Sequence, residues 1–407
     1  MKPDTTGLAR ALAAASLVAS LLLAAACASA QTVKIGVVLP YSGVGAEFGQ
    51  QVDRGIQTFM KMNPNAFGGV KVELVKRDSK NPSGAEAKTA VQELIAQEKV
   101  DILTGFIYSP DAIASAPLAT EGKKPMIIMN AGTAWITTLS PMISRVSFSM
   151  WHAGHAMGEA SVGTLKAKTA VVGYTDFPPG KDSLDAFKRG FEAKGGKVID
   201  EIPMGGPGQV PDFTPFFQRA KDKKPDVFFV FVPSGDHAVA VAKTYSALGM
   251  KQAGIKLVGP GDLTPDHKLQ SMGDAAVGMI TIHHYNADLP TPLNKRFVEQ
   301  WKKDFGANST PDFMGVQGYD GMAAIAHVVT TLKGKIDPDA AVNALRGWKY
   351  SSPRGPISID PRTRDIVMNE YLSEIVKKDG RLYQKNIGVI TAVKDMCKEL
   401  AEGRCKQ

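Results

Sequence analysis

Apolar runs of strand length alternate with amphipathic segments of helix length along most of this 407-residue chain. The run Val227–Val232 is continuously apolar, as expected for a strand that is buried on both faces of a sheet. The segment Asp236–Leu248 instead has apolar residues at helical spacing. Regular alternation of this kind favours right-handed β-α-β units, with parallel strands covered by helices on both faces. The predicted fold class is therefore α/β.

Strand and helix candidates follow one another in a regular order. The predicted strands are Val33–Pro40, Val70–Arg77, Ile102–Gly105, Met126–Asn130, Thr169–Tyr174, Lys197–Ile202, Val227–Val232, Lys256–Gly259 and Met279–His283. The predicted helices are Glu47–Lys61, Ser83–Gln97, Ser109–Glu121, Ser183–Lys194, Thr214–Lys221 and Asp236–Leu248.

The same order of elements occurs twice. One set of units ends near Ser149, and a second begins at Lys166–Tyr174. In each half a Gly-Gly pair, at 68–69 and at 195–196, stands where a helix gives way to a strand, and glycine commonly ends a helix there. The chain is also longer than one hydrophobic core usually serves. We therefore expect two related lobes.

Residues 1–30 have the three parts of a secretory signal peptide. Lys2 and Arg10 supply positive charge, Leu12–Ala26 is apolar, and 28–30 is a small-residue cleavage site. A membrane anchor is disfavoured because the apolar run is near the lower length limit for a span. We expect the mature chain to be exported.

The chain has three cysteines. Cys27 ends the apolar run, and its lipidation remains an alternative, although the aliphatic residue usual three places before it is missing. Cys397 and Cys405 lie near the C-terminus, and an isolated pair in an oxidising compartment favours a local disulfide. A metal or redox role would need more ligands or a C-x-x-C spacing.

The formal net charge of +8 comes from Lys and Arg residues that are spread along the chain. A nucleic-acid-binding surface typically has basic residues interleaved with aromatic residues in one stretch, and this chain has no such stretch. We interpret the charge as a solvated surface and expect no nucleic-acid partner.

Two loops at the ends of neighbouring predicted strands have the features of an anion site. Ser109 follows Ile102–Gly105 as a candidate N-cap, with Pro110 at the first helical position. Residues 131–133, Ala-Gly-Thr, follow Met126–Asn130 and offer free N–H groups and a hydroxyl. Ligands of open α/β sheets bind at the carboxyl ends of strands. The N–H and O–H donors of these two loops can together hold a carboxylate without any Arg or Lys. Aromatic candidates for an apolar wall are Phe48, Tyr108, Trp151, Phe177 and Phe313.

Enzyme functions are disfavoured. In a Rossmann-like oxidoreductase Gly43 and Gly45 would begin the dinucleotide motif, but Gly49 is one residue late for G-x-G-x-x-G. A hydrolase lacks its nucleophile motif, because Pro40 stands where G-x-S-x-G needs a glycine before Ser42.

A metal site would have to draw on His152, His155, His283 and His284. Adjacent histidines on a strand are expected to point to opposite faces, so only one of the last two can join a given site. We predict no metal site.

At this point the chain resembles a known family. The segment Val37–Gly43 (VVLPYSG), followed by Phe48-Gly49, resembles the opening of the leucine/isoleucine/valine-binding proteins, which are periplasmic solute receptors of ABC importers. Further matches are Gly259-Pro260-Gly261, Gly318-Tyr319-Asp320 and Gly355–Asp360. The matches cover nearly the whole mature chain in the expected order.

The resemblance implies a type I periplasmic-binding fold. Two Rossmann-like lobes with parallel sheets would be joined by three hinge crossovers, with the ligand between them. The N-terminal lobe would take residues 31–149 plus 284–354, and the C-terminal lobe residues 150–283 plus 355–407. The protein would be a periplasmic monomer that needs no cofactor, catalyses nothing and delivers its ligand to an ABC permease and ATPase complex.

The resemblance also implies a set of ligand-binding residues. The family's carboxylate site matches Ser109, Ala131 and Thr133, and its apolar walls match Phe48, Ile107 and Phe313. The complete predicted set is Ser42, Phe48, Ile107, Tyr108, Ser109, Ala131, Gly132, Thr133, Trp151, His152, Phe177, Ser234, Asp262 and Phe313.

The half of the site that binds the amine departs from the family. The family's acidic residue falls on Gly261, with Asp262 next to it. A buried ammonium without its partner costs several kcal/mol. We therefore rank an amine-free aromatic or aliphatic carboxylate above a branched-chain or other hydrophobic amino acid. His152, Ser234 or Asp262 would bind a ring hydroxyl or another polar group. A sensory receptor subunit with the same fold remains an alternative.

Overall fold

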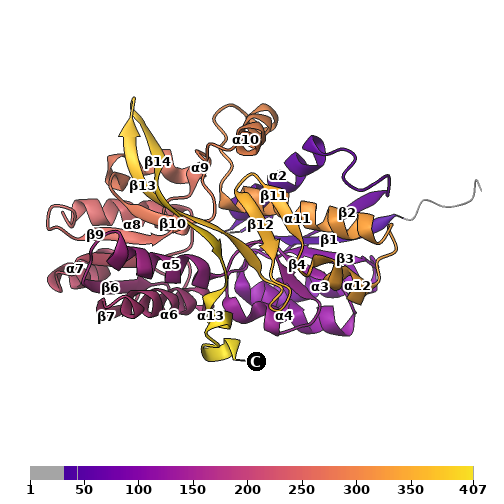
Figure 1. The fold of residues 1–407 in the computed structure, drawn as a ribbon, viewed down its shortest axis with the longest axis horizontal. Coiled ribbons are helices and arrows are strands. Elements are labelled where there is room, and N and C mark those ends of the chain that lie inside the picture. The colour runs from indigo at the N-terminus through magenta and orange to yellow at the C-terminus, as the bar shows by residue number, and fades with distance from the viewer. Residues whose placement is uncertain (1–31, 44, 407) are drawn as a thin grey trace, which may run out of the picture.

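The computed structural model describes residues 32–43 and 45–406, which form two sheets with helices packed around them (Figure 1). The predicted signal peptide, residues 1–30, and Cys27 lie outside the described residues. None of the described helices is long and apolar enough to cross a membrane. Most strands are parallel and alternate with helices, so the predicted α/β class is confirmed.

The first sheet is parallel throughout. Its strands are β1 (Val33–Leu39), β2 (Val72–Asp78), β3 (Ile102–Gly105), β4 (Met126–Ile128) and β5 (Ile143–Arg145). They lie in the order β2-β1-β3-β4-β5. The connecting helices are α2 (Ala46–Met62), α3 (Ala85–Ala96) and α4 (Ser109–Glu121). Because β1 lies between β2 and β3, the direction in which strands are added to the sheet reverses at β1. The loops that follow β1 and β3 therefore begin side by side, at the carboxyl ends of adjacent strands.

The second sheet combines parallel and antiparallel strands. Its parallel strands are β6 (Thr169–Tyr174), β7 (Lys197–Pro203), β8 (Val227–Phe231), β9 (Lys256–Pro260) and β10 (Ile280–His283). The antiparallel strands are β11 (Lys349–Ser352), β12 (Gly355–Ile359), β13 (Ile366–Lys378) and β14 (Arg381–Val393). Its helices are α5 (Met150–Gly163), α6 (Pro178–Ala193), α7 (Thr214–Asp222), α8 (Asp236–Ala247) and α9 (Asp266–Met272).

Three later helices return to the part of the molecule built on the first sheet, where they contact α2, β4 or β5 (Figure 1). They are α10 (Pro292–Phe305), α11 (Phe313–Thr331) and α12 (Pro338–Leu345). Helix α11 packs so closely on α2 that a Cβ on Gly55 would lie 1.9 Å from the carbonyl oxygen of Gly315. We call the first sheet with α2–α4 and α10–α12 the N-terminal lobe, and the second sheet with α5–α9 the C-terminal lobe. The chain passes between the lobes after β5, after β10 and after α12.

Some elements differ from the sequence prediction. Helix α6 begins at Pro178 rather than at Ser183, because proline suits the first helical turn, where its missing N–H is not needed. The long hairpin of β13 and β14 was not predicted, although the residues of β13 alternate between more and less buried over most of its length.

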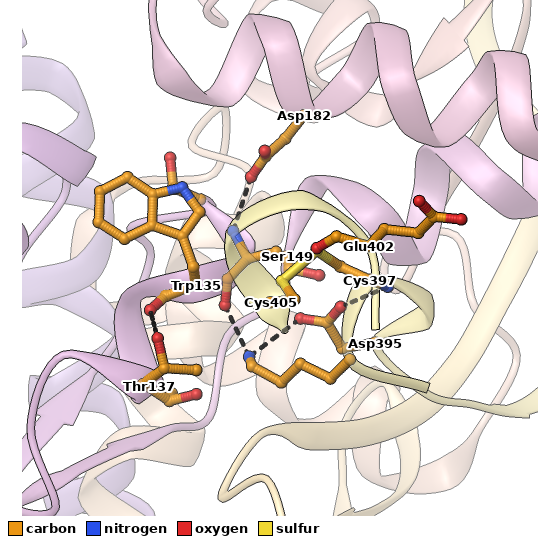
Figure 2. Close-up of a disulfide and its surroundings, with 12 residues drawn as sticks. Trp135, Thr137, Ser149, Asp182, Asp395, Cys397, Glu402 and Cys405 are labelled. Atoms are coloured by element: carbon orange, nitrogen blue, oxygen red, sulfur yellow. Dashed lines mark hydrogen bonds and ion pairs between the residues drawn. A yellow bond between two sulfur atoms is a disulfide. The ribbon is translucent and has the colours of Figure 1, made fainter. Parts of the chain in front are cut away.

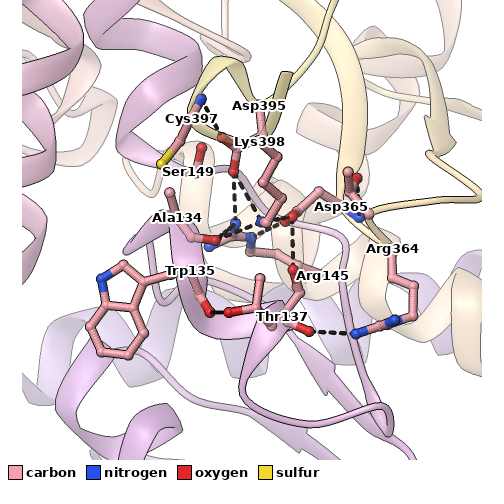
Figure 3. A network of polar contacts seen from close by, with 12 residues as sticks. Ala134, Trp135, Thr137, Arg145, Ser149, Arg364, Asp365, Asp395, Cys397 and Lys398 are labelled. Atoms are coloured by element: carbon pink, nitrogen blue, oxygen red, sulfur yellow. Dashed lines mark hydrogen bonds and ion pairs between the residues drawn. The ribbon is translucent and has the colours of Figure 1, made fainter. Parts of the chain in front are cut away.

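Buried ion pairs connect the end of β5 with the start of β13 and with the C-terminal tail (Figure 3). Arg145 Nε lies 2.5 Å from Asp365 Oδ1, and Arg145 Nη2 lies 3.3 Å from Asp395 Oδ2. Lys398 contacts Asp365 and lies 3.2 Å from Asp395. Although burial opposes ionisation, Arg145 and Lys398 lower the pKa of Asp365 to about 2. This cluster therefore holds the crossover between the lobes with charges that are buried from solvent.

The C-terminal tail is closed by a disulfide between Cys397 and Cys405 (Figure 2). Both cysteines are buried and pack in one apolar cluster with Trp151 and Ala134. Asp395 accepts a hydrogen bond from the Cys397 amide at 3.0 Å. The disulfide therefore fixes the segment that supplies Asp395 and Lys398 to the buried ion pairs.

Replacing Asp365 with Asn is expected to destabilise the protein by about 3–5 kcal/mol, because Arg145 and Lys398 then lose a buried partner. Urea unfolding at pH 7 measures the change. Since the pKa of Asp365 is lowered, its contribution is present above the ordinary pKa near 4 and is lost as the pH falls toward about 2. The difference between the two proteins should therefore shrink at low pH.

The control is Glu399→Gln, which removes a more exposed partner of Arg362 at 2.6 Å and should cost no more than about 1 kcal/mol. Equal stability of the Asp365→Asn variant and the wild type at pH 7 would contradict the assigned role of the cluster.

Candidate functional site

A cavity of about 370 Å³ lies between the two lobes, at the carboxyl ends of their parallel strands. The N-terminal lobe and the first crossover contribute Glu47, Phe48, Pro82, Ile107, Tyr108, Ser109, Asn130, Gly132, Phe148, Met150 and Met314. The C-terminal lobe contributes Phe177, Pro179, Pro207, Gly208, Phe231, Pro233, Ser234, Asp236, His237 and Asp262. Among these lining residues none is Lys or Arg.

Many of the residues predicted from the sequence lie at this cavity. They are Phe48, Ile107, Tyr108, Ser109, Gly132, Phe177, Ser234 and Asp262. They come from both lobes and from loops that lie far apart in the chain. The strand-end rule supplies the loop and aromatic candidates among them, and the family resemblance supplies Ile107, Ser234 and Asp262.

Other predicted residues do not line the cavity. Ser42 is turned toward Asp78, to which its hydroxyl donates a 2.6 Å hydrogen bond. Trp151 packs against the C-terminal disulfide and lines a separate cleft beside α6. Phe313 packs edge-on against Phe148, with ring centroids 6.1 Å apart, and lies behind that ring rather than in the wall.

His152 also points away from the cavity. Its Nδ1 contacts the Ser149 amide and hydroxyl at the start of α5, and its Nε2 lies 3.0 Å from the carbonyl oxygen of Ile366. It is fully buried and caps α5. Its place at the first crossover is therefore explained by helix capping and by a contact with the start of β13.

The donors at the N-terminal-lobe wall differ in detail from the prediction. Tyr108, not Ser109, is the N-cap of α4, and Ser109 is the first helical residue. The Ser109 oxygen accepts a 3.1 Å hydrogen bond from the Thr133 amide. A free N–H group is predicted there from the sequence, and that prediction is wrong for Thr133. The Ser109 hydroxyl proton can still donate into the cavity. Ala131 and Thr133 are fully buried and lie outside the lining.

A strained backbone shapes this wall. Phe106 follows β3 with a φ of 63°, in the left-handed region that non-glycine residues rarely adopt. Its amide donates to Val38 and its carbonyl accepts from Ala131, which holds the loop in place. Asn130 donates its side-chain amide to the Ile107 carbonyl at 2.8 Å, while its buried Oδ1 has no hydrogen-bond partner among the described residues.

Aromatic rings form the remaining walls. Phe177 and Phe231 of the C-terminal lobe are stacked, with ring centroids 6.0 Å apart. Phe48 and Tyr108 of the N-terminal lobe meet edge to face at 6.5 Å. The cavity thus offers rings to a flat apolar group from both lobes.

Asp262 supplies a buried acid at the opposite wall. It lies in the short helix η2 (Gly261–Leu263) directly after β9 and is 7% exposed. Its Oδ2 meets no hydrogen-bond partner among the described residues. Burial raises the pKa of Asp262 to about 7. Ser234, its neighbour, donates its hydroxyl to the Asp262 carbonyl at 3.2 Å.

Ion pairs join the two lobes at the mouth of the cavity. Glu47 of α2 lies 2.8 Å from Lys268 and 3.8 Å from His267, both in α9. His267 also lies 2.7 Å from Asp312, the N-cap of α11. His267, followed by Lys268, lowers the pKa of Glu47 to about 2 against the effect of burial. Burial opposes protonation of His267, but Asp312 and Glu47 raise its pKa to about 9.

The histidines considered for a metal form no site. His283 ends β10, so the alternation of sides stops there, and its ring centroid lies 4.2 Å from that of His284 rather than on the opposite face as predicted. Burial lowers the pKa of His283 to about 3. No group of three His, Cys, Asp or Glu residues suited to a metal occurs in residues 32–43 and 45–406.

Sequence reasoning missed several cavity residues. Asn130 ends one predicted strand and Phe231 lies one residue before the end of another, so the strand-end rule could have found both. Phe148 lies in the first crossover, which no periodicity marks. Glu47 and His267 carry no sequence signal for an ion pair, because their elements meet only in the folded chain.

The comparisons with known proteins agree on one family. Residues 32–381 match the family model described as periplasmic binding protein. A Leu/Ile/Val-binding protein homolog of Brucella melitensis is 39% identical over 90% of this chain and 93% of its own length.

Two solved structures have the same fold. A solute-binding protein of an ABC transporter from Rhodopseudomonas palustris BisB5, in complex with 3,4-dihydroxy benzoic acid, is 42% identical, with a TM-score of 0.84 over 90% of this chain and 99% of that one. Another from Rhodopseudomonas palustris HaA2, in complex with p-hydroxybenzoic acid, is 37% identical, with a TM-score of 0.85 over 89% and 98%. The resemblance inferred from the sequence is confirmed, and the chain belongs to the periplasmic binding protein family.

Proposed function

We propose that this protein captures a small aromatic carboxylate and delivers it to an ABC importer. The observation that carries the proposal is the cavity, which has neutral hydroxyl and amide groups at one wall and aromatic rings from both lobes. The two similar solute-binding proteins hold hydroxylated benzoic acids, which fit the same description.

The carboxylate would bind at the N-terminal-lobe wall. The Ser109 hydroxyl donates to it, while the Thr133 amide holds the Ser109 oxygen in position. The start of α4 adds a favourable helix dipole. The ring would then lie among Phe48, Phe177 and Phe231, where edge and face contacts add to the burial of apolar area.

The protein would act outside the cytoplasm. Export through the signal peptide at 1–30 would place it in the periplasm as a monomer, with a permease and ATPase complex as its partner and no nucleic acid. The two lobes would move as two bodies about the crossovers, and the closed form would be the one that the permease recognises.

A hydrophobic amino acid is the second candidate. The unpartnered oxygen of Asp262 can accept from an ammonium group as well as from a hydroxyl, and the Brucella relative is called a Leu/Ile/Val-binding protein homolog. The acid stands one position beyond the family's usual place, so the aromatic carboxylate ranks first.

Calorimetric titration of refolded, ligand-free protein is expected to show tight binding of benzoate-type acids and weak or no binding of leucine, because the carboxylate has donors and the ring has aromatic walls. Short fatty acids test the aliphatic alternative. Tight binding of leucine, with no detectable binding of benzoate-type acids or short fatty acids, would reverse the ranking.

Replacing Ser109 with Ala is expected to weaken binding of benzoate by about 10- to 100-fold, because a charge-assisted hydrogen bond contributes roughly 1.5–3 kcal/mol. Titration calorimetry of the purified variant measures this. Ser42→Ala is the matched control, since the Ser42 hydroxyl bonds Asp78 outside the cavity. Equal affinities of Ser109→Ala and wild type would place the carboxylate elsewhere.

Replacing Lys268 with Met is expected to speed ligand release by about 2- to 5-fold, because the closed form then loses a partly exposed ion pair with Glu47 worth up to about 1 kcal/mol. Stopped-flow displacement measures the release rate. Lys377→Met, which removes an exposed pair with Asp274 within one lobe, is the control. An unchanged rate for Lys268→Met would mean that the mouth contacts do not hold the lobes together.

A further inference from the structure

The cavity contains one buried acid whose chemistry the proposed carboxylate and ring contacts leave unused. Asp262 is 7% exposed, and its Oδ2 has no hydrogen-bond partner among the described residues. A buried polar atom without a partner costs free energy. A ligand that brings a donor to this oxygen recovers that cost, whereas a ligand without one leaves the oxygen unpaired.

The position of Asp262 fixes which part of the ligand meets it. Ser109 belongs to α4 of the N-terminal lobe, and Asp262 belongs to η2 of the C-terminal lobe, with the cavity between them. A carboxylate bound at Ser109 directs the rest of the ring toward the other lobe. A second anionic or purely apolar group is unfavourable beside a carboxyl group, so the group that faces Asp262 has to be a hydrogen-bond donor.

We propose that Asp262 is a specificity-determining residue that, in its ionised form, accepts a hydrogen bond from a ring hydroxyl remote from the ligand's carboxylate. The protein would therefore select ring-hydroxylated benzoates over benzoates without a donor at that position. This inference rests on the proposed function and names the subclass of ligand. The selectivity would arise because a site built to pair with a hydroxyl is left with an unpaired buried group when the ligand lacks that hydroxyl.

The bond is coupled to a proton. Burial raises the pKa of Asp262 to about 7, so part of the population is protonated near neutral pH. When the ligand hydroxyl donates, the carboxylate form is favoured, and the proton of the Asp262 carboxyl group passes to the buffer. The hydroxyl keeps its own proton, so no bond in the ligand is broken.

The other titratable groups near Asp262 keep one protonation state near neutral pH, so a proton released on binding comes from Asp262. Asp312 adds to the rise of its pKa, but Asp312 itself is paired with His267. His283, which faces the adjacent glycine, is neutral because burial lowers its pKa to about 3. Glu47 stays ionised, because its contact with His267 lowers its pKa to about 2.

Two further titratable side chains line the same wall. Asp236 lies 3.0 Å from Lys268, and burial lowers the pKa of His237. Asp236→Asn and His237→Asn therefore serve as controls for charge in the cavity. Each is expected to change the affinities for ligands with and without the hydroxyl by the same factor.

The test compares 4-hydroxybenzoate with 4-fluorobenzoate, which is similar in size but has no donor. Calorimetry at pH 7 is expected to show a preference of the wild type for the hydroxyl of about 10- to 100-fold, as for a hydrogen bond to a charged group. The titration is then repeated in buffers of different ionisation enthalpy, which reports the number of protons exchanged on binding. Binding of 4-hydroxybenzoate should release protons, and binding of 4-fluorobenzoate should release none or take protons up.

Asp262→Ala is expected to lower the preference to within about 3-fold, because 4-hydroxybenzoate binds more weakly while 4-fluorobenzoate binds no more weakly than to the wild type. Asp262→Asn, which keeps the shape and loses the charge, should abolish the proton release, and thermal unfolding of both ligand-free variants checks that they fold. Equal affinities of the wild type for the two ligands, or an equal loss for both in Asp262→Ala, would overturn the inference. Failure of every benzoate to bind the wild type would instead overturn the proposed function.

Discussion

The buried guanidinium of Arg145 connects the hinge of this protein to its cavity. Its Nε and Nη2 pair with Asp365 and Asp395, and its Nη1 donates hydrogen bonds to the carbonyl oxygens of Ala131 and Thr133, at 3.1 and 2.7 Å. The amide of Thr133 in turn donates to the Ser109 oxygen. A charge that must be neutralised in the interior thus orients the loop that orients the cavity hydroxyl.

In the proposed function the two lobes would supply complementary chemistry to one ligand. The N-terminal lobe would offer neutral donors to an anion, and the C-terminal lobe would offer Asp262 to a hydrogen-bond donor. A ligand with both groups would contact both lobes and so favour the closed arrangement in which the ion pairs of Glu47 and His267 form. Closure and recognition would then depend on the same contacts.

Much of the fold and part of the cavity could be predicted from the sequence. Strand periodicity and the strand-end rule placed Ser109 near the cavity, and the family pattern drew attention to Asp262. Side-chain direction could not be predicted, because it depends on distant partners. His152 points away since its ring meets Ile366, and Ser42 turns to Asp78 on the neighbouring strand. The ion pairs of Glu47 with His267 and Lys268 could not be predicted, because these partners lie in the other lobe.

A crystal structure of the protein with 4-hydroxybenzoate would show directly which groups hold the ligand. We expect the ligand between the lobes, with its carboxylate within hydrogen-bonding distance of Ser109 Oγ and its ring beside Phe177 and Phe231. A ligand bound outside this cavity, or one held in it with no contact to Ser109, would contradict the assigned site.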